Sequence, residues 1–214
     1  MDHFSSMTEL LSTLPARDNY TIHVDGSHAS KVKIFAPHGG CIEPCTGPIA
    51  LALAIDDFDC FVFSGVRKKD CFKTLHVTST HYDEPRCLAM VQEAEVALAL
   101  HGCDGDDAFA QVGGGNEELV RKLSGYLIGL GYSVVPVSGK LKGEDQRNFI
   151  NRARQKGIQL ELSAGFRRNL FPSFPRSIQR HPEEFPKFIE SMRSWMLGIE
   201  RPLASGMLPH ERSN

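Results

Sequence analysis

The sequence lacks the features that mark membrane and secreted proteins. No apolar run approaches the roughly 18 residues that a membrane-spanning helix needs. The first twenty residues contain Asp2 and Glu9 and no unbroken apolar stretch of the kind found in secretory signals. We therefore expect a soluble, cytoplasmic protein that has no membrane partner.

An excess of charge of either sign is also absent. Lys and Arg number 24 against 26 Asp and Glu, which gives a formal net charge of −2 with His neutral. Proteins that bind nucleic acid usually carry a clear basic excess. We therefore expect no nucleic-acid partner, and an anionic ligand would have to be met by a local group of basic side chains.

Cysteine is present, but without the spacing of a structural zinc site. The six cysteines are Cys41, Cys45, Cys60, Cys71, Cys87 and Cys103. None forms the CxxC pair typical of zinc ribbons. The chain is also longer than the small disulfide-rich secreted domains and has no export signal, so we expect mostly buried, free thiols.

What remains is the composition of a globular domain. Hydrophobic residues make up 41% and charged residues 23% of the chain, close to the averages of folded soluble proteins. At about 150 residues per domain, this length corresponds to one domain. We place it at residues 1–200 and interpret residues 201–214, where periodicity is lost, as a C-terminal tail. We expect a monomer.

The order of predicted elements indicates the fold class. Short runs rich in β-branched residues alternate with segments of helical spacing, which predicts an α/β fold: one domain, with a mixed, mainly parallel sheet flanked by helices. The predicted strands are residues 32–36, 60–63, 74–78, 96–100, 133–137 and 158–162, and the predicted helices are 47–55, 85–94, 116–130 and 183–199. In the third helix, Asn116 is expected to be the N-cap and Gly131 to end the helix.

Polar residues follow three of these strands at their carboxyl ends, where α/β sheets bind ligands. His38 and Glu43 follow the first strand, His101 follows the fourth, and Glu161 lies at the carboxyl end of the sixth. Two imidazoles and a carboxylate are the ligand set of a catalytic zinc ion that keeps one position open for water. Two glycines after His38 allow the sharp turn that brings Glu43 back. Taken singly, each of these residues is also an ordinary loop or capping residue.

Glu161 interrupts the strand IQLEL, and two interpretations of it remain open. On a half-exposed edge strand, Glu161 is a solvent-facing carboxylate. In a central strand, a buried carboxylate is costly unless it is paired, bound to metal or used in proton transfer. Next to a metal site, such a group can accept the proton of the attacking water and pass it to the leaving amine.

The motifs in their order resemble a known family. IFAPHGGCIEPCTGPIALAL, LHVTSTHYDEPRC, LALHGCDGDD, VGGGN, NFINR and GIQLELSAGFRR follow one another between about residues 31 and 168. This series resembles the zinc-dependent poly-γ-glutamate hydrolases first described from bacteriophage. The resemblance implies a fold akin to the carboxypeptidase A type of zinc peptidase, and an anionic γ-glutamyl polymer or peptide as substrate.

The resemblance also implies roles for individual residues. One zinc ion per chain would be held by His38, Glu43 and His101, and Glu161 would be the catalytic carboxylate. Cys41 and Cys45 depart from the family pattern, where glycine is expected.

Further candidates come from the chemistry that such a reaction needs. The oxyanion requires a cation or hydrogen-bond donors, and we assign Arg152, in a segment of helical spacing that places it on one face with Asn148. The alternative for Arg152 is an exposed helix arginine. For substrate binding we assign His81, Asn148, Asn151 and Arg167, whereas His76 is expected to be a packed, hydrogen-bonded histidine within a strand.

Other functions remain open at the level of sequence. The same zinc chemistry can act on another amide, such as a peptidoglycan or N-acyl amino acid bond. A non-catalytic binding module of the same fold is a second alternative. A cysteine nucleophile, Cys103 beside His101, is a third.

Overall fold

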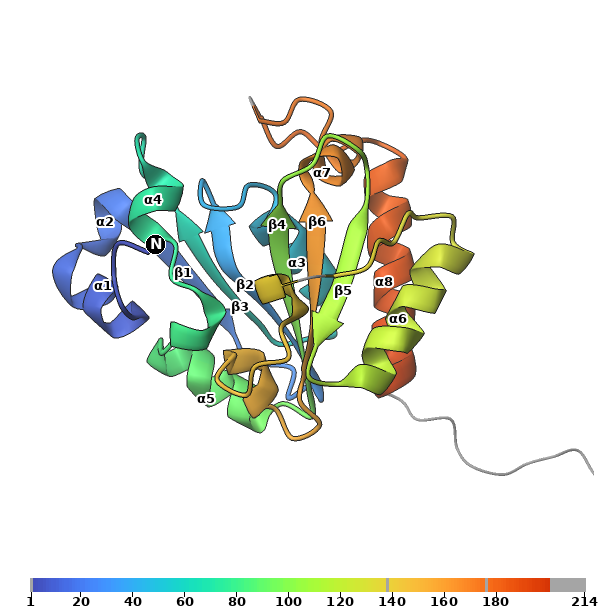
Figure 1. The fold of residues 1–214 in the computed structure, drawn as a ribbon, viewed down its shortest axis with the longest axis horizontal. Helices are drawn as coiled ribbons and strands as arrows, with labels where there is room; N and C mark the ends of the chain where they lie inside the picture. The colour runs from blue at the N-terminus through green and yellow to red at the C-terminus, as the bar shows by residue number, and fades with distance from the viewer. Residues whose placement is uncertain (1, 138, 176, 201–214) are drawn as a thin grey trace, which may run out of the picture.

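A computed structural model describes residues 2–137, 139–175 and 177–200, and its centre is one six-stranded β-sheet (Figure 1). The strands are β1 Tyr20–Asp25, β2 Val32–Gly40, β3 Cys60–Gly65, β4 Val96–Cys103, β5 Ala110–Gly114 and β6 Gly157–Ser163, in the order β1-β3-β2-β4-β6-β5. β3, β2, β4 and β6 run parallel, and β1 and β5 join antiparallel at the two edges. This confirms the expected α/β class with a mixed, mainly parallel sheet.

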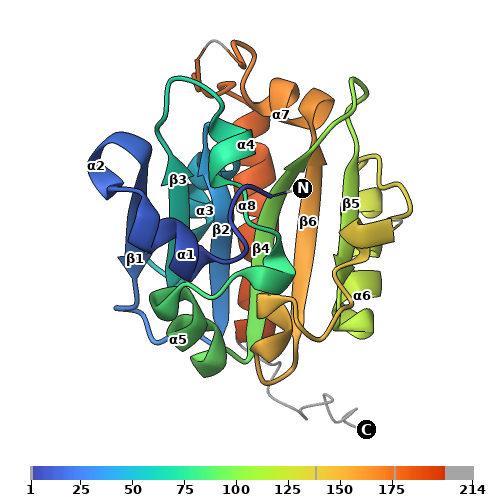
Figure 2. The ribbon, with the colours of Figure 1, turned by 60° about the vertical axis from the view of Figure 1, so that its left-hand side comes forward.

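Helices cover both faces of the sheet (Figures 1 and 2). The α-helices are α1 Met7–Thr13, α2 Ala16–Asn19, α3 Thr46–Ala54, α4 Cys71–Leu75, α5 Pro85–Glu93, α6 Glu117–Gly129, α7 Ala164–Leu170 and α8 Glu184–Glu200, and the 3-10 helices are η1 Ser79–His81, η2 Gly139–Lys142 and η3 Phe149–Arg152. The four predicted helices are confirmed as α3, α5, α6 and α8. Asn116 is the N-cap of α6, since its side chain accepts a hydrogen bond from the amide of Leu119.

Successive residues of the central strands face two different cores. Ile34 of β2 belongs to the core under α3, α6, α7 and α8, whereas its neighbour Phe35 belongs to the core under α1, α5 and η3. Side chains of a strand alternate between the two faces of a sheet, so a strand covered on both faces is apolar throughout. This explains why CFVF of β3 and VALAL of β4 appear in the sequence as continuous apolar runs.

Two of the predicted strands are wrong. Residues 71–75 form α4 and residues 76–78 run on without pairing, because Leu75 and Val77 bury themselves in the core beneath α5 rather than join the sheet. Residues 133–137 make only a single bridge, between Val134 and Ala110. β1 and β5 were not predicted. β5 is hidden in the glycine-rich run VGGG, where Gly114 adopts a φ of +126° against the backbone of Gly157.

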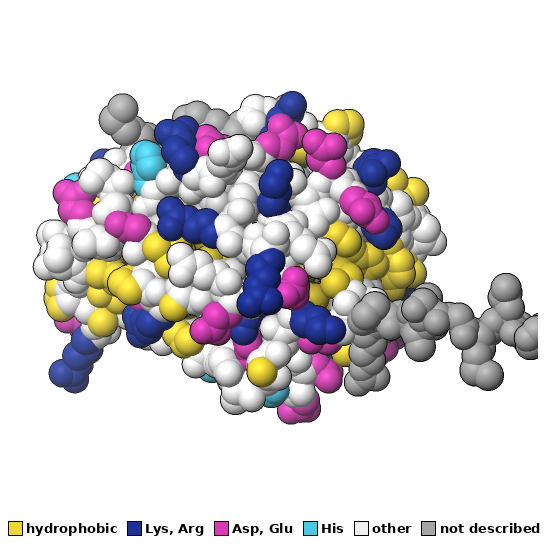
Figure 3. Space-filling model, turned by 90° about the horizontal axis from the view of Figure 1, so that it is seen from below, with side chains coloured by type: hydrophobic (Ala, Val, Ile, Leu, Met, Phe, Trp, Pro, Cys, Tyr) yellow, Lys and Arg dark blue, Asp and Glu magenta, His cyan; other side chains and the backbone are white. Residues whose placement is uncertain are grey.

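The surface at the amino ends of the parallel strands carries Lys and Arg side chains interspersed with Asp and Glu (Figure 3). This face therefore has no field of a single sign, in keeping with the near-zero net charge. Within the described residues, no helix combines the length and apolar character needed to cross a bilayer. The predicted tail at 201–214 lies outside the described residues.

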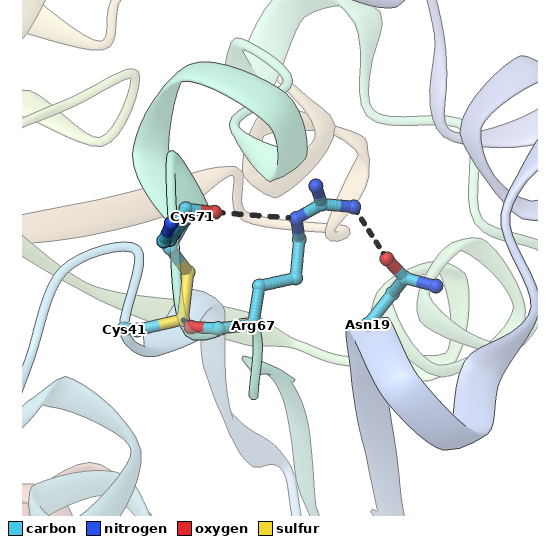
Figure 4. The surroundings of a disulfide bond; sticks show 5 residues. Asn19, Cys41, Arg67 and Cys71 are labelled. Carbon is cyan, nitrogen blue, oxygen red and sulfur yellow. Dashed lines mark hydrogen bonds between the residues drawn. A yellow bond between two sulfur atoms is a disulfide. The ribbon is translucent and has the colours of Figure 1, made fainter.

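The expectation of free thiols holds for four cysteines and is wrong for two. Cys45, Cys60 and Cys87 are buried and free, and Cys103 is half-buried and free. Cys41 and Cys71 form a disulfide bond that ties the loop after β2 to the start of α4 (Figure 4). The pairing arises because the amide of Cys41 bonds to the carbonyl of Gly65 at the end of β3, 3.0 Å away, and α4 follows β3 closely.

Candidate metal centre

Three side chains meet at the carboxyl edge of the sheet. Nδ1 of His38 lies 3.0 Å from Oε1 of Glu43 and 3.2 Å from Nδ1 of His101. Nδ1 of His101 lies 3.4 Å from Oε2 of Glu43. All three residues are buried. The structure therefore brings together the three residues whose types suggested a metal site.

The turn after β2 is what returns Glu43 to His38. The pairing of β2 with β3 shifts register between Ala36 and Gly39. Gly40 then takes a φ of +66°, and a Cβ there would lie 2.1 Å from the carbonyl oxygen of Gly65, so that only glycine fits. The amide of Glu43 donates to the carbonyl of His38 at 2.7 Å and closes the turn.

The rings are oriented by contacts behind them. Nε2 of His38 lies 2.9 Å from the carbonyl oxygen of Val77. A carbonyl oxygen only accepts hydrogen bonds, so Nε2 carries the hydrogen and donates it. In the neutral ring, Nδ1 of His38 then carries no hydrogen, and its lone pair faces Glu43 and His101. The amide of Gly102 donates to Oε2 of Glu43 at 2.9 Å and fixes the carboxylate. Nε2 of His101 is buried and, among the described residues, has no hydrogen-bond partner.

Burial and neighbouring charges shift the pKa values of the cluster in opposite directions. Burial by itself raises the pKa of Glu43, but the adjacent imidazoles of His38 and His101 hold that pKa well below its ordinary value. Burial lowers the pKa of His101, whereas the carboxylates of Glu161 and Glu43 outweigh it and raise this pKa to about 9. A buried imidazole between two carboxylates requires a proton or a metal cation. The donor set therefore fits a divalent cation such as zinc.

His76 is a further imidazole of the site, and the sequence did not assign it there. Its ring centroid lies 4.3 Å from that of His38, and its Nε2 lies 4.0 Å from Oε1 of Glu43. Its Nδ1 is held 2.8 Å from Oδ1 of Asp2. His38, Glu43 and His76 also lie close enough to share an ion. Nδ1 of His101 lies nearer to Glu43 than Nε2 of His76 does, at 3.4 Å against 4.0 Å, whereas the ring of His76 lies nearer to that of His38, with centroids 4.3 Å apart against 5.1 Å.

The N-terminal segment is part of this arrangement. The amide of Thr78 donates to Oδ2 of Asp2 at 2.8 Å, while the other carboxylate oxygen meets His76. Figure 2 shows the start of the chain beside α4 and across the carboxyl ends of the central strands. The hydrogen-bonded character expected for His76 is confirmed, and its placement in a strand is wrong.

Glu161 lies next to this cluster in a central strand. β6 is paired on one side with β4, where Glu161 is opposite His101, and on the other side with β5, where it is opposite Gln111. Glu161 is only 4% exposed, so the alternative of a solvent-facing edge carboxylate is wrong. Burial raises the pKa of Glu161 above its ordinary value, against the lowering effect of His101.

A large open cavity connects these groups to the surface. Its volume is about 1260 Å³, and His38, Glu43, His101 and Glu161 lie at its polar base. His81 and Asn148, both assigned to substrate binding, line it as well. Lys142 and Arg147, which the sequence reasoning did not select, supply basic side chains to its wall.

Arg152 is not among the residues that line this cavity. It is exposed at the end of η3, so the structure does not bring it to the site. The expectation assumed an α-helix, in which Asn148 and Arg152 share a face. Asn148 instead caps a 3-10 helix, whose three residues per turn separate positions four apart.

Arg167 and Asn151 also lie outside the cavity lining and hold backbone instead. The guanidinium of Arg167 donates to the carbonyls of Pro44 and Cys103 at 2.9 Å each. Arg167 is 5% exposed, and its guanidinium packs against Gly102 close to the side chain of Glu43. The side-chain amide of Asn151 donates to the carbonyl of Gly143 at 2.8 Å. Both residues shape the walls of the site from the outside.

The fold and the site together define a class of protein. A mainly parallel sheet gathers two imidazoles and a carboxylate at its carboxyl edge, beside another buried carboxylate, and this set of side chains is of the kind that holds a divalent cation. Residues 4–191 match the model of the family described as poly-gamma-glutamate hydrolase. The chain belongs to this family, which confirms the resemblance seen in its motifs.

Two proteins of Bacillus subtilis (strain 168) are similar to this chain in sequence. The SPbeta prophage-derived UPF0714 protein YoqZ is 33% identical over 147 residues, which are 67% of this chain and 53% of that protein. The UPF0714 protein YndL is 33% identical over 171 residues, 76% of this chain and 66% of that protein. The chain thus spans between about half and two thirds of the length of these two relatives.

Three solved structures have a fold similar to that of this chain. A structure described as YNDL-apo (Zinc-free) has a TM-score of 0.86 at 29% identity and covers 94% of this chain and 100% of that chain. A bacteriophage poly-gamma-glutamate hydrolase has a TM-score of 0.83 at 27% identity, with the same coverage. The N-formylglutamate amidohydrolase from Ralstonia eutropha JMP134, at 13% identity, a TM-score of 0.55 and coverage of 85% of this chain and 97% of its own, shares the fold alone.

Proposed function

We propose that this chain is a zinc-dependent hydrolase that cleaves the γ-glutamyl amide bonds of poly-γ-glutamate. The observation that carries the proposal is the meeting of His38, Glu43 and His101, with contacts of 3.0–3.4 Å, beside the buried Glu161. Membership of the poly-gamma-glutamate hydrolase family and the description of one relative as zinc-free support the same reading.

His38, Glu43 and His101 would hold one zinc ion per chain. When bound, the ion polarises the scissile carbonyl and lowers the pKa of water at the site. Two neutral imidazoles and one carboxylate leave a coordination position open, as a catalytic rather than a structural site requires. The hydrogen bonds from His38 to Val77 and from Gly102 to Glu43 keep the donors in place before the ion binds.

Glu161 is the proposed general base and acid. Its carboxylate takes a proton from the attacking water as the water oxygen bonds to the carbonyl carbon. When the carbon–nitrogen bond breaks, Glu161 returns that proton to the leaving amine. Burial raises the pKa of Glu161, and a raised pKa makes this carboxylate a stronger base.

The cavity wall would recognise the anionic substrate. Each residue of a γ-glutamyl polymer carries a free α-carboxylate, so a groove for it needs repeated cationic or hydrogen-bonding contacts. Lys142, Arg147 and His81 line the cavity and are the proposed contacts. Arginine is suited to this role because its planar fork pairs with both oxygens of a carboxylate.

Purified protein loaded with zinc tests the proposal with poly-γ-glutamate as substrate. We expect shorter polymer chains and new amino groups with the wild type, and a loss of at least about 100-fold in kcat with Glu161→Gln at unchanged zinc content. Glu190→Gln, on the exposed face of α8, is the matched control and should behave as the wild type. Near-normal turnover by Glu161→Gln would remove the assigned base.

The choice of substrate is tested separately. A peptidoglycan fragment and an N-acyl glutamate are assayed beside the polymer under the same conditions. Zinc-dependent cleavage of one of these, with no action on poly-γ-glutamate, would keep the metal centre and overturn the substrate.

A further inference from the structure

Glu161 accepts a hydrogen bond from the second of two buried amide side chains that are themselves hydrogen-bonded to each other. Nε2 of Gln159 donates to Oε1 of Glu161 at 3.0 Å, and Nδ2 of Asn148 donates to Oε1 of Gln159 at 3.0 Å. All three residues are 4% exposed. Gln159 precedes Glu161 by two positions in β6, so that both side chains stand on the same face of the sheet.

Asn148 sets the direction of the hydrogen bonds that run from it through Gln159 to Glu161. Asn148 is the N-cap of η3, and its Oδ1 accepts a hydrogen bond from the amide of Ile150 at 3.4 Å. A backbone N–H can only donate, so the oxygen of Asn148 must face Ile150 and its NH2 group must face Gln159. The oxygen of Gln159 is then taken by Asn148, and its NH2 group must face Glu161.

A second contact secures the same orientation. The other hydrogen of the Gln159 NH2 group is donated to the carbonyl oxygen of Leu141, 2.9 Å away. Gly143 packs on the amide from above, where a Cβ would lie 2.4 Å from Oε1 of Gln159. The amide of Gln159 is therefore clamped between the loop at 141–143 and η3, and a flipped orientation would place its oxygen against two acceptors.

We propose that Gln159 is a positioning residue for Glu161, with its donor polarity imposed by Asn148. The inference rests on the proposed function, because it assigns Gln159 to the carboxylate taken there as base. Gln159 holds one carboxylate oxygen, which aims the other oxygen of Glu161 at the metal cluster and the cavity.

The test is a double-mutant cycle on the zinc-loaded enzyme. Gln159→Met removes the donor with little change of volume. Asn148→Asp keeps an acceptor for Ile150 but cannot donate to Gln159, so a carboxylate oxygen faces the oxygen of Gln159 and the amide loses the contact that holds it from the η3 side. We expect kcat to fall about 10–100-fold in each variant, the range typical of groups that orient a catalytic side chain, with unchanged zinc content.

The double variant separates positioning from general damage. If Asn148 acts only through Gln159, the double variant has the kcat of Gln159→Met alone, because the two losses are one loss. Gln155→Met, at an exposed position of the same loop region, is the control and should keep wild-type kcat. Thermal midpoints are measured throughout, and kcat is compared at temperatures well below each midpoint.

Two results would overturn the inference. One is wild-type kcat in Gln159→Met; the other is losses that multiply in the double variant, which would show that Asn148 acts on its own. Glu161→Gln keeps this distinct from the proposed function: an active Glu161→Gln enzyme refutes the base itself, whereas an inactive one beside a fully active Gln159→Met enzyme refutes only the positioning role.

Discussion

Each of the three imidazoles around Glu43 has its ring nitrogens committed in a different way. His38 donates to a backbone carbonyl, His76 is held by the carboxylate of Asp2, and the Nε2 of His101 is buried without a partner among the described residues. A carbonyl or carboxylate behind a histidine is the usual support of a metal ligand. His38 and His76 both meet this criterion, and the proposal of His101 as third ligand rests on its closer contact with Glu43, at 3.4 Å against 4.0 Å for His76.

Cys103 lines the cavity two residues after His101, and its thiol is not expected to be a nucleophile. Burial, followed by the negative charge of Glu161, raises the pKa of Cys103 to about 11, so almost no thiolate exists at neutral pH. We expect Cys103→Ser to keep turnover within about twofold of the wild type. Initial rates on poly-γ-glutamate check this, and a loss as large as that of Glu161→Gln would restore the cysteine mechanism.

The pH dependence of turnover reports on Glu161. Its carboxyl must be ionised to accept a proton, and burial raises its pKa above the ordinary 4.5. As the pH falls through that raised value, the carboxylate is protonated and activity is lost. We therefore expect the acid limb of kcat/KM to lie above pH 4.5, measured in buffers of constant ionic strength with zinc in excess. An acid limb at or below the ordinary value would contradict a buried base.

At the scale of elements, the disulfide joins two segments that both reach the site. Cys41 lies two residues before Glu43, and Cys71 begins α4, which leads to His76. The family pattern suggested glycine at position 41, so this cross-link distinguishes the chain from that pattern. It ties the loop that carries Glu43 to the start of α4 (Figure 4).

Loss of this disulfide should lower stability. A cross-link that closes a loop of 30 residues contributes about 2–4 kcal/mol, chiefly by restricting the unfolded chain. We expect the thermal midpoint to fall in the presence of reductant, as followed by circular dichroism. The double variant Cys41→Ser with Cys71→Ser should show the lowered midpoint without reductant and no further change with it; a reductant effect that persists in this variant would implicate other groups.

At the scale of the whole molecule, the candidate metal centre connects elements distant in the sequence. His38 lies two residues before the end of β2, Glu43 lies in the turn before α3, and His101 lies two residues before the end of β4. An ion bound there would join two central strands and a loop in the folded chain only. Binding to the native state alone stabilises it by mass action, by about 2.7 kcal/mol at a ligand concentration 100 times the dissociation constant.

Removal of metal is therefore expected to affect both stability and turnover. Dialysis against a chelator should lower the thermal midpoint and abolish cleavage, and one equivalent of zinc should restore both. Elemental analysis should find about one zinc per chain. His38→Ala should lose the zinc-dependent gain in midpoint. A midpoint that is the same with and without metal would argue against a site built from these residues.

Much of the fold could be predicted from the sequence because strands and helices produce local patterns of apolar residues. β3 and β4 were recognisable as continuous apolar runs, since strands covered on both faces bury every side chain, and β6 was recognisable by its alternating apolar residues. The helices α5, α6 and α8 followed from helical spacing, and the polar residues at strand ends followed from the general place of ligands in α/β sheets. The family motifs fall on these same segments.

The tertiary structure decided what depends on contacts between distant segments. β5 carries two glycines and needs its partner β6 to be a strand, while residues 74–78 satisfy their apolar side chains in a core without pairing. Asp2 reaches His76, and Cys41 reaches Cys71, only because the folded sheet brings those segments together. Spacing along a chain fixes which face a side chain occupies, but only packing fixes what that face meets, and so Arg152 lies outside the cavity while Lys142 and Arg147 line it.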